Sequence, residues 1–183
     1  MLENNLPSWR QDLKSTRKKE GKSPSNKWIQ LATVNKKNQP RLRTVVFRGW
    51  HKDSSMIIFT DRRSEKIEHL RHNPKAEILW LFLKSKTQYR FKGEIIELCD
   101  NKNYWDTLSE KSKSSWFWRS PGDRINPKLQ SAYEILSNLP KSENFVVLNF
   151  EVDSVDLLKL EQPINRRYLW KKNNKWKKIE INP

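Results

Sequence analysis

The feature that most constrains the fold is a succession of short strand-like segments joined by brief polar turns. The segments WIQLATV (28–34), RLRTVVFRGW (41–50) and MIIFT (56–60) are rich in β-branched and aromatic residues, which favour strands. The connections NKKNQP and HKDSS are too short to hold another element, so neighbouring segments should pair antiparallel. This part of the chain is therefore predicted to form an antiparallel meander.

Strand-like sequence continues to the end of the chain. The apolar run AEILWLFL (76–83) predicts a strand buried on both faces, and QYRFKGEIIEL (88–98) predicts a long strand with a bulge at Gly93. Closing strands are expected at 144–160, 166–172 and 175–181. The pair Asn173-Asn174 suggests a tight hairpin between the last two. Because closure removes exposed sheet edges, the predicted fold is mainly β, an antiparallel barrel with peripheral helices.

Helical sequence lies around these strands. An N-terminal helical segment (1–26) holds a helix over 6–20, and Ser64 is a suitable N-cap for a short helix that Asn73-Pro74 ends. A helical excursion is expected over 101–140, including an amphipathic piece at 128–138. With no repeat and no dividing linker, residues 1–183 are interpreted as a single domain.

The charge balance indicates a preference for anions but names no partner. Lys and Arg number 37 against 21 Asp and Glu, a net charge of +16, which favours nucleic acid, anionic membranes or phosphorylated ligands. Many lysines, such as Lys36, Lys37 and Lys171, stand in loops or tails, so an ordinary solvated surface explains most of the charge.

Several classes of site and location are disfavoured by what the sequence lacks. The single cysteine, Cys99, excludes an intramolecular disulfide and a cysteine-based zinc site. His69 and His72 have ligand spacing on a helix, but no third ligand is evident, and no metal is expected. No apolar stretch resembles a signal peptide or a membrane span, so a cytoplasmic location is expected.

The best candidate for a binding site runs from Arg43 to Lys66. Arginine binds phosphate oxygens with two donors, Thr60 and Ser64 add hydroxyls, and a helix start favours an anion. Arg43 and Arg48 differ in parity, so on a regular strand they face opposite sides, and only a bend, a bulge or a second subunit lets both reach one ligand. Cross-strand charge pairs beside an ordinary N-cap are the alternative.

Three runs in order resemble the pyridoxamine 5′-phosphate oxidase family, in particular its FMN-binding branch from cyanobacteria and plants. They are LATVNKKNQPRLRTVVFRGW (31–50), IIFTDRRSEKIEHLRHNPKAEILWLF (57–82) and TQYRFKGEIIEL (87–98). The likeness implies an FMN-binding split β-barrel of Greek-key type. It also implies an obligate homodimer with FMN at the subunit interface.

The resemblance further implies which residues hold the cofactor. The positions that match FMN contacts are Arg43, Thr44, Val45, Val46, Phe47, Arg48, Phe59, Thr60, Ser64, Lys66, Gln88 and Arg167. Gln88 is expected to approach the flavin from the partner subunit. The family's usual arginine is replaced by Glu65, which makes Arg62 or Arg63 a candidate substitute for the missing phosphate contact.

The substrate positions depart from the family pattern. Tyr104 matches a substrate-phosphate tyrosine and Ser112 loosely matches a serine of the same set, but Leu108 replaces an arginine. Where family oxidases carry Arg-Leu-His before the closing arginine, this chain has Pro163, Ile164 and Asn165. The flavin site is thus largely kept, and the vitamin-phosphate site is mostly lost.

Three functions follow from these observations. The first is an FMN-dependent oxidoreductase with a substrate other than pyridoxine phosphate, and the second is a non-catalytic flavin carrier, sensor or electron-transfer protein. A nucleic-acid-binding barrel is the least favoured and rests only on charge and aromatic content. The aromatic cluster Trp105, Trp116, Phe117 and Trp118 either stacks a flat ligand or, as we favour, packs the helical excursion against the barrel.

Overall fold

The computed structural model describes residues 6–52, 54–124 and 135–183. Its strands are β1 (Trp28–Val34), β2 (Pro40–His51), β3 (Ser55–Asp61), β4 (Lys75–Phe82), β5 (Thr87–Glu97), β6 (Phe145–Lys159), β7 (Arg166–Lys171) and β8 (Ile179–Ile181). Its α-helices are α1 (Ser8–Glu20), α2 (Glu65–His72), α3 (Lys102–Asp106) and α4 (Glu110–Ser114). Short 3₁₀ turns lie at Pro24–Asn26, Ser115–Phe117 and Lys172–Asn174. No described helix has the length and apolar character that a membrane crossing requires.

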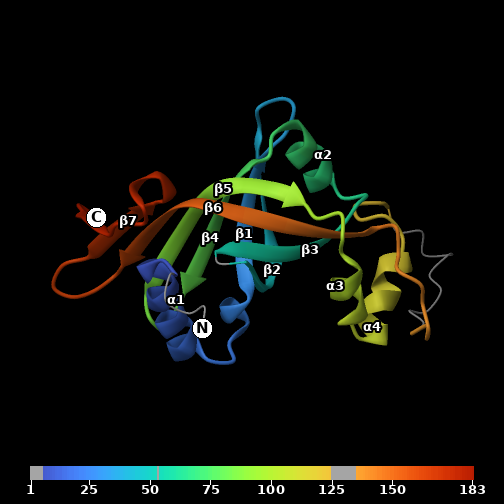
Figure 1. Ribbon diagram of the computed structural model, residues 1–183, viewed down its shortest axis with the longest axis horizontal. Helices are drawn as coiled ribbons and strands as arrows, with labels where there is room; N and C mark the ends of the chain where they lie inside the picture. The colour runs from blue at the N-terminus through green and yellow to red at the C-terminus, as the bar shows by residue number, and fades with distance from the viewer. Residues whose placement is uncertain (1–5, 53, 125–134) are drawn as a thin grey trace.

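An antiparallel sheet closes into a six-stranded barrel. The strand order is β3-β2-β1-β4-β5-β6, and a further pairing of β3 with β6 closes the ring (Figure 1). The long strand β6 serves two partners on one edge, because residues 145–150 pair with β3 and residues 154–159 pair with β7. β7 and β8 therefore extend the sheet beyond the barrel, and the mainly-β fold expected from the sequence is confirmed.

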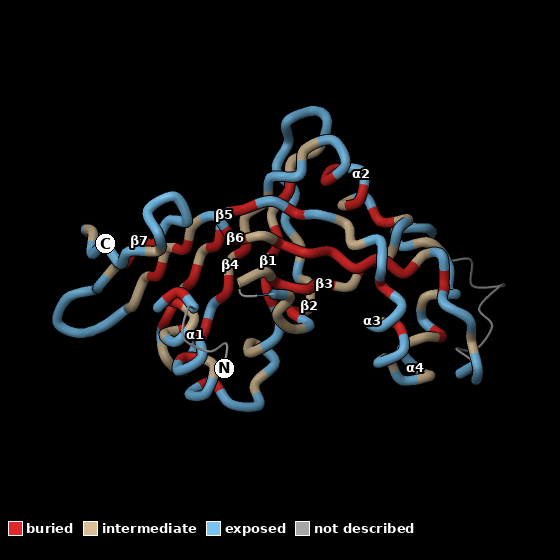
Figure 2. Tube along the Cα trace, in the orientation of Figure 1, coloured by how far each residue is buried: buried red, intermediate tan, exposed pale blue. Residues whose placement is uncertain are grey.

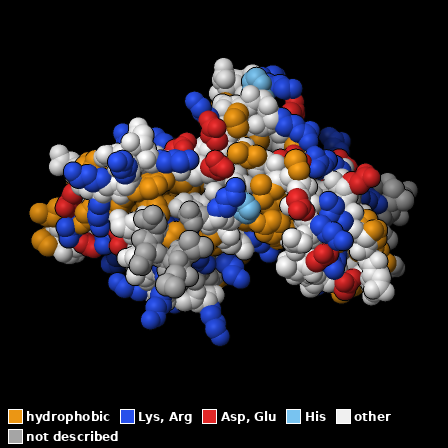
Figure 3. Space-filling view, in the orientation of Figure 1, with side chains coloured by type: hydrophobic (Ala, Val, Ile, Leu, Met, Phe, Trp, Pro, Cys, Tyr) orange, Lys and Arg blue, Asp and Glu red, His pale blue; other side chains and the backbone are white. Residues whose placement is uncertain are grey.

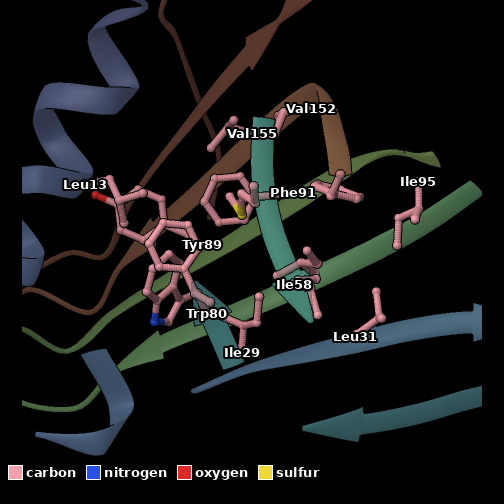
Figure 4. Close-up of a cluster of buried hydrophobic side chains, with 14 of the residues drawn as sticks. Leu13, Ile29, Leu31, Ile58, Trp80, Tyr89, Phe91, Ile95, Val152 and Val155 are labelled. Carbon is pink, nitrogen blue, oxygen red and sulfur yellow. The ribbon is translucent and has the colours of Figure 1, made fainter. Parts of the chain in front are cut away.

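Inward-facing side chains of the strands form the main core. The largest include Trp80, Tyr89 and Phe91, which lie together at the centre (Figure 4). Trp9 and Leu13 of α1 complete this cluster at one end of the barrel. Figure 2 shows burial alternating along β4 and β5, as expected for a barrel wall with one face in the core.

The strand buried on both faces is β6, not β4. β4 alternates between buried and exposed positions, and Leu81 on its outer face is 39% exposed. Every residue from Phe145 to Phe150 in β6 is buried, because the segment with α3 and α4 covers the outer face of β3 and β6. The expectation for 76–83 was therefore wrong: its apolar run belongs to a barrel wall with an uncovered outer face.

The C-terminal hairpin also differs from the expectation. Residues Lys172–Asn174 form a 3₁₀ turn, Lys175 and Trp176 have positive φ angles of 49° and 58°, and pairing resumes only at Ile179. The Trp176 ring packs 5.9 Å from Trp9, so the chain turns inward here instead of forming a strand from 175. The amphipathic piece predicted at 128–138 falls mostly outside the described residues.

Charged side chains are spread over the surface. On the face shown in Figure 3, Lys and Arg are scattered over the surface and do not gather in a single patch. This distribution agrees with a solvated surface as the reason for most of the net charge of +16.

Candidate functional site

The turn between β3 and α2 is fixed by an ion pair within three residues. Arg63 binds both carboxylate oxygens of Asp61, at 3.0 Å from Nε to Oδ1 and 2.7 Å from Nη2 to Oδ2, and its backbone N–H donates to Oδ1 at 2.8 Å. Ser64 lies at the N-cap position, but its hydroxyl donates to the Asp61 carbonyl at 2.6 Å and makes no capping bond to the helix. The helix thus begins after Ser64 as expected, but without a capping bond from its hydroxyl, and the Ser64 oxygen can accept another donor.

Lys66 provides that donor. Its ammonium donates to Ser64 Oγ and to Thr60 Oγ1, both at 2.9 Å, while Thr60 and Ser64 are themselves buried. Within the described part of the chain, no carboxylate lies within ion-pair distance of Lys66. Burial, followed by the nearby charge of Arg43, lowers the pKa of Lys66.

Arg43 approaches the same place from inside the barrel. Nη1 donates to Thr33 Oγ1 at 2.6 Å and to the Leu31 carbonyl at 3.2 Å, and Thr33 also shares a hydrogen bond with His69 Nδ1 at 3.1 Å. Burial lowers the pKa of Arg43. Two partly buried cations therefore stand together with neutral oxygens as partners, an arrangement that a bound anion would stabilise. We call Arg43, Thr60, Ser64 and Lys66 the cation cluster.

Arg48 lies on the other face of β2. Val45 and Phe47 pack against the core, whereas Thr44 and Arg48 are exposed. A register shift does occur between Phe47 and Gly49, but the Arg48 guanidinium lies over the Phe59 ring, 5.2 Å from its centre, outside the barrel. One chain therefore does not bring Arg48 into the cation cluster.

The other basic residues near the turn are committed elsewhere. Arg62 pairs with Glu97 at 2.6 Å, and Arg63 pairs with Asp61. Neither takes the place of the arginine that Glu65 replaces, so the suggestion that one of them substitutes for it is not supported.

Gln88 and Arg167 stand on the outward face of the sheet. They share one cross-strand rung, because Leu158 pairs with both, and the neighbouring residues Tyr89 and Tyr168 point into the core. Gln88 also pairs with Leu81, and Arg43 pairs with Leu31, whose partner on β4 is Ile78, three residues from Leu81. At about 3.3 Å per residue, the Gln88–Arg167 rung lies about 10 Å along the sheet from the rung of Arg43.

The two predicted substrate residues, Tyr104 and Ser112, have different surroundings. Tyr104 in α3 shares a hydrogen bond with His51 Nδ1 at 3.0 Å, and its ring lies 5.8 Å from that of Phe59. Ser112 is exposed in α4, where its backbone N–H donates to the Ser109 hydroxyl. Tyr104 thus lies beside one predicted flavin contact, Phe59, and Ser112 makes only local contacts.

The aromatic cluster of the helical excursion mainly packs this segment against the barrel. Trp105 and Trp116 both lie within 5.3 Å of the Phe145 ring and join a second hydrophobic cluster on the outer face of β3 and β6. Phe117 and Trp118 remain exposed, at 43% and 56%.

Comparison with known proteins identifies the family. The model of the pyridoxamine 5′-phosphate oxidase FMN-binding domain matches residues 6–98. The chain belongs to the pyridoxamine 5′-phosphate oxidase family. A relative from Arabidopsis thaliana named pyridoxine/pyridoxamine 5′-phosphate oxidase 2 is 36% identical over 148 residues, which cover 73% of this chain and 74% of that protein. A relative of the same name from Hydrogenovibrio crunogenus is 34% identical over 85 residues, 45% of this chain and 39% of that protein.

Solved structures agree with the family and the barrel. A pyridoxamine 5′-phosphate oxidase-related, FMN-binding protein from Nostoc punctiforme superposes with a TM-score of 0.87 at 27% identity, covering 97% of this chain and 99% of that one. PhzG from Burkholderia lata, solved with tetrahydrophenazine-1-carboxylic acid, gives 0.80 at 17% identity and covers 100% and 95%, a likeness of fold alone.

FMN is the cofactor of this oxidase family, and the cation cluster fits its phosphate. Lys66 and two hydroxyls meet at the start of α2, and Arg43 lies close enough for its charge to lower the pKa of Lys66. The described residues place no carboxylate in an ion pair with Arg43 or Lys66. Sequence reasoning missed Thr33, which holds Arg43. Its position could have been found from strand parity, because Ile29, Leu31 and Thr33 share the inward face of β1.

Proposed function

We propose that this chain is an FMN-dependent oxidoreductase of pyridoxamine 5′-phosphate oxidase type with an altered substrate site. The observation that carries the proposal is the cation cluster, in which Arg43 and Lys66 face neutral oxygens in a chain of an FMN-binding family. Bound FMN supplies the hydride and electron chemistry. The residues of this chain would hold its phosphate, orient the ring and limit access of water.

The same proposal includes a homodimer with FMN between subunits. The cation cluster and the Gln88–Arg167 rung face opposite sides of the barrel wall, so one FMN contacts both sets only when a second copy presents its outward face. The outer wall of the barrel also exposes apolar side chains on β1 and β2: Trp28 is 53% exposed and Leu42 69%. A paired sheet face would remove this surface from water.

The substrate differs from that of the named relatives. Residues 163–165 lie in an exposed loop between β6 and β7, with Ile164 71% exposed, and they carry no cationic or histidine side chain. Anion recognition by Arg and His at these positions is therefore absent. The same observation supports the second candidate, a flavin-binding carrier or electron-transfer protein without turnover.

One set of measurements tests both candidates. The purified full chain is examined for a flavin visible spectrum and titrated with FMN, and oxygen consumption is then followed with pyridoxamine 5′-phosphate and other small reductants. Failure to bind FMN would refute both candidates. Bound FMN with turnover of a small donor supports the oxidoreductase, whereas bound FMN that no donor reduces favours the carrier.

A further inference from the structure

Asp156 of β6 lies between two arginines on the outward face of the sheet. Its Oδ2 accepts from Arg90 Nη2 at 2.6 Å and from Arg167 Nη2 at 2.7 Å, and its Oδ1 accepts from Arg167 Nε at 3.0 Å. The Asp156 side chain is 17% exposed, so these bonds are partly shielded from water. Arg167 is therefore held at two points in the plane of its guanidinium.

Strand register places this group beside Gln88. Arg90 pairs with Asp156, and Asp156 pairs with Leu169; on the next same-face rung, Gln88 and Arg167 flank Leu158. Gln88, Arg90, Asp156 and Arg167 thus occupy two adjacent rungs on one face of β5, β6 and β7. Nothing in the sequence pattern singled out Arg90 or Asp156.

The charges of the group do not balance. Two guanidinium groups share one carboxylate, and the described residues place no second carboxylate in an ion pair with either arginine. Burial alone would raise the pKa of Asp156, but the hydrogen bonds and charges of Arg167 and Arg90 lower it below its ordinary value. The carboxylate is therefore ionised at neutral pH, and the group keeps a net positive charge.

The bonding pattern also leaves one side of Arg167 available. Asp156 engages Nε and Nη2, and no described residue accepts a hydrogen bond from Nη1. A guanidinium held along one edge presents its remaining donors in a fixed direction, which lowers the entropy lost when a ligand binds.

We propose that Asp156, anchored by Arg90, is a positioning residue that orients Arg167 toward FMN. The inference rests on the proposed function, in which Arg167 of one subunit faces a flavin bound at the interface. Arg90 keeps the carboxylate in place by its bond to Oδ2, so that Asp156 cannot follow Arg167 if that side chain moves.

The substitution Asp156→Asn separates positioning from simple charge. It removes a negative charge beside two cations, so electrostatic attraction alone predicts tighter binding of the anionic FMN. Positioning predicts the opposite, because the amide has one accepting oxygen and an NH2 group that cannot accept from an arginine, and the two arginines then repel each other. Loss of a charge-assisted, two-point contact should raise the FMN Kd about tenfold.

The experiment compares the FMN Kd of the wild-type full chain, D156N and the control E180Q. Glu180 pairs with Arg166 at 3.1 Å, so E180Q makes the same charge change and breaks an arginine–carboxylate pair at the residue next to Arg167. We expect weaker binding in D156N and an unchanged Kd in E180Q. An unchanged or smaller Kd in D156N, even with a lower unfolding temperature, would overturn the inference.

A second variant covers the case in which D156N does not fold. Asp156→Glu keeps the charge and displaces the carboxylate by one methylene. Positioning therefore predicts an FMN Kd several-fold higher, whereas charge alone predicts an unchanged Kd. An unchanged Kd in D156E would overturn the inference. A wild-type chain that binds no FMN would instead refute the proposed function before any variant is compared.

Discussion

Replacing Lys66 by methionine should weaken FMN binding through the phosphate alone. Methionine keeps most of the length and the apolar character of the lysine stem and removes the charge. The ammonium makes two bonds of 2.9 Å to neutral hydroxyls, so a phosphate in the cation cluster would be its charged partner. Coulomb's law at about 4 Å with an effective dielectric constant of about 20 sets a ceiling of about 4 kcal/mol. Desolvation reduces this, and hydrogen bonds to charged groups contribute about 1.5–3 kcal/mol.

A loss of about 2 kcal/mol corresponds to an FMN Kd about 30-fold higher. Quenching of flavin fluorescence measures this constant, and riboflavin, which lacks the phosphate, provides the matched ligand. Lys36→Met is the control variant, because Lys36 pairs with Glu68 of α2 at 3.0 Å outside the cation cluster. K66M should weaken FMN and leave riboflavin unchanged. Equal weakening of both ligands, or of neither, would refute the assignment of Lys66 to the phosphate.

Two further substitutions, each with a matched control substitution, test the barrel and the proposed dimer. A Cβ at Gly93 would lie 1.9 Å from the Glu151 carbonyl oxygen, so G93A must push β5 from β6 at the bulge and should cost about 3 kcal/mol in urea unfolding. Gly122→Ala, with no neighbour within 4 Å, should cost about 1 kcal/mol, and an equal loss in both would contradict the steric account. Leu42→Glu should convert a dimer to a monomer in sedimentation, whereas Leu83→Glu, equally exposed at 69% but in a turn, should not. A monomeric wild type would refute the dimer.

Local sequence was sufficient for the strands of the meander. The strand predicted at 28–34 is β1, residue for residue, and the segments at 41–50 and 56–60 lie within one residue of β2 and β3 at each end. β-branched residues between polar turns define such strands without reference to the rest of the chain. The bulge at Gly93 was also predictable, because a residue with no side chain permits the close approach of β6.

Features set by distant packing were not predictable in this way. β4 and β6 both have strongly apolar sequences, and only the position of α3 decides which of them has its outer face covered. Trp176 does not continue the strand, because its ring packs against Trp9, which is far away in the sequence. The strand and helix propensities of the residues carry no information on either contact.

The same division holds for the site. Thr60, Ser64 and Lys66 lie within seven residues, so a strand end followed by a helix start was enough to group them. Thr33 and Asp156 accept hydrogen bonds from Arg43 and Arg167 on neighbouring strands, and these contacts depend on the register of the sheet. The residues proposed to bind FMN were thus easier to find from the sequence than the residues that contact and hold them.

The lowered pKa of Lys66 links the cofactor site to stability. Burial, then Arg43, places the folded-state pKa below that of the unfolded chain, so the native state binds fewer protons between these two values. The FMN-free protein should therefore gain stability as pH rises through this interval. The destabilisation that comes from burying the charged Lys66 is complete below its pKa in the folded state. It is absent above its pKa in the unfolded chain, about 10.4. A bound phosphate favours the charged lysine and raises its pKa, so FMN should flatten this rise. Urea unfolding of wild type and K66M between neutral and alkaline pH measures the difference, and an equal pH slope in both proteins would contradict the linkage.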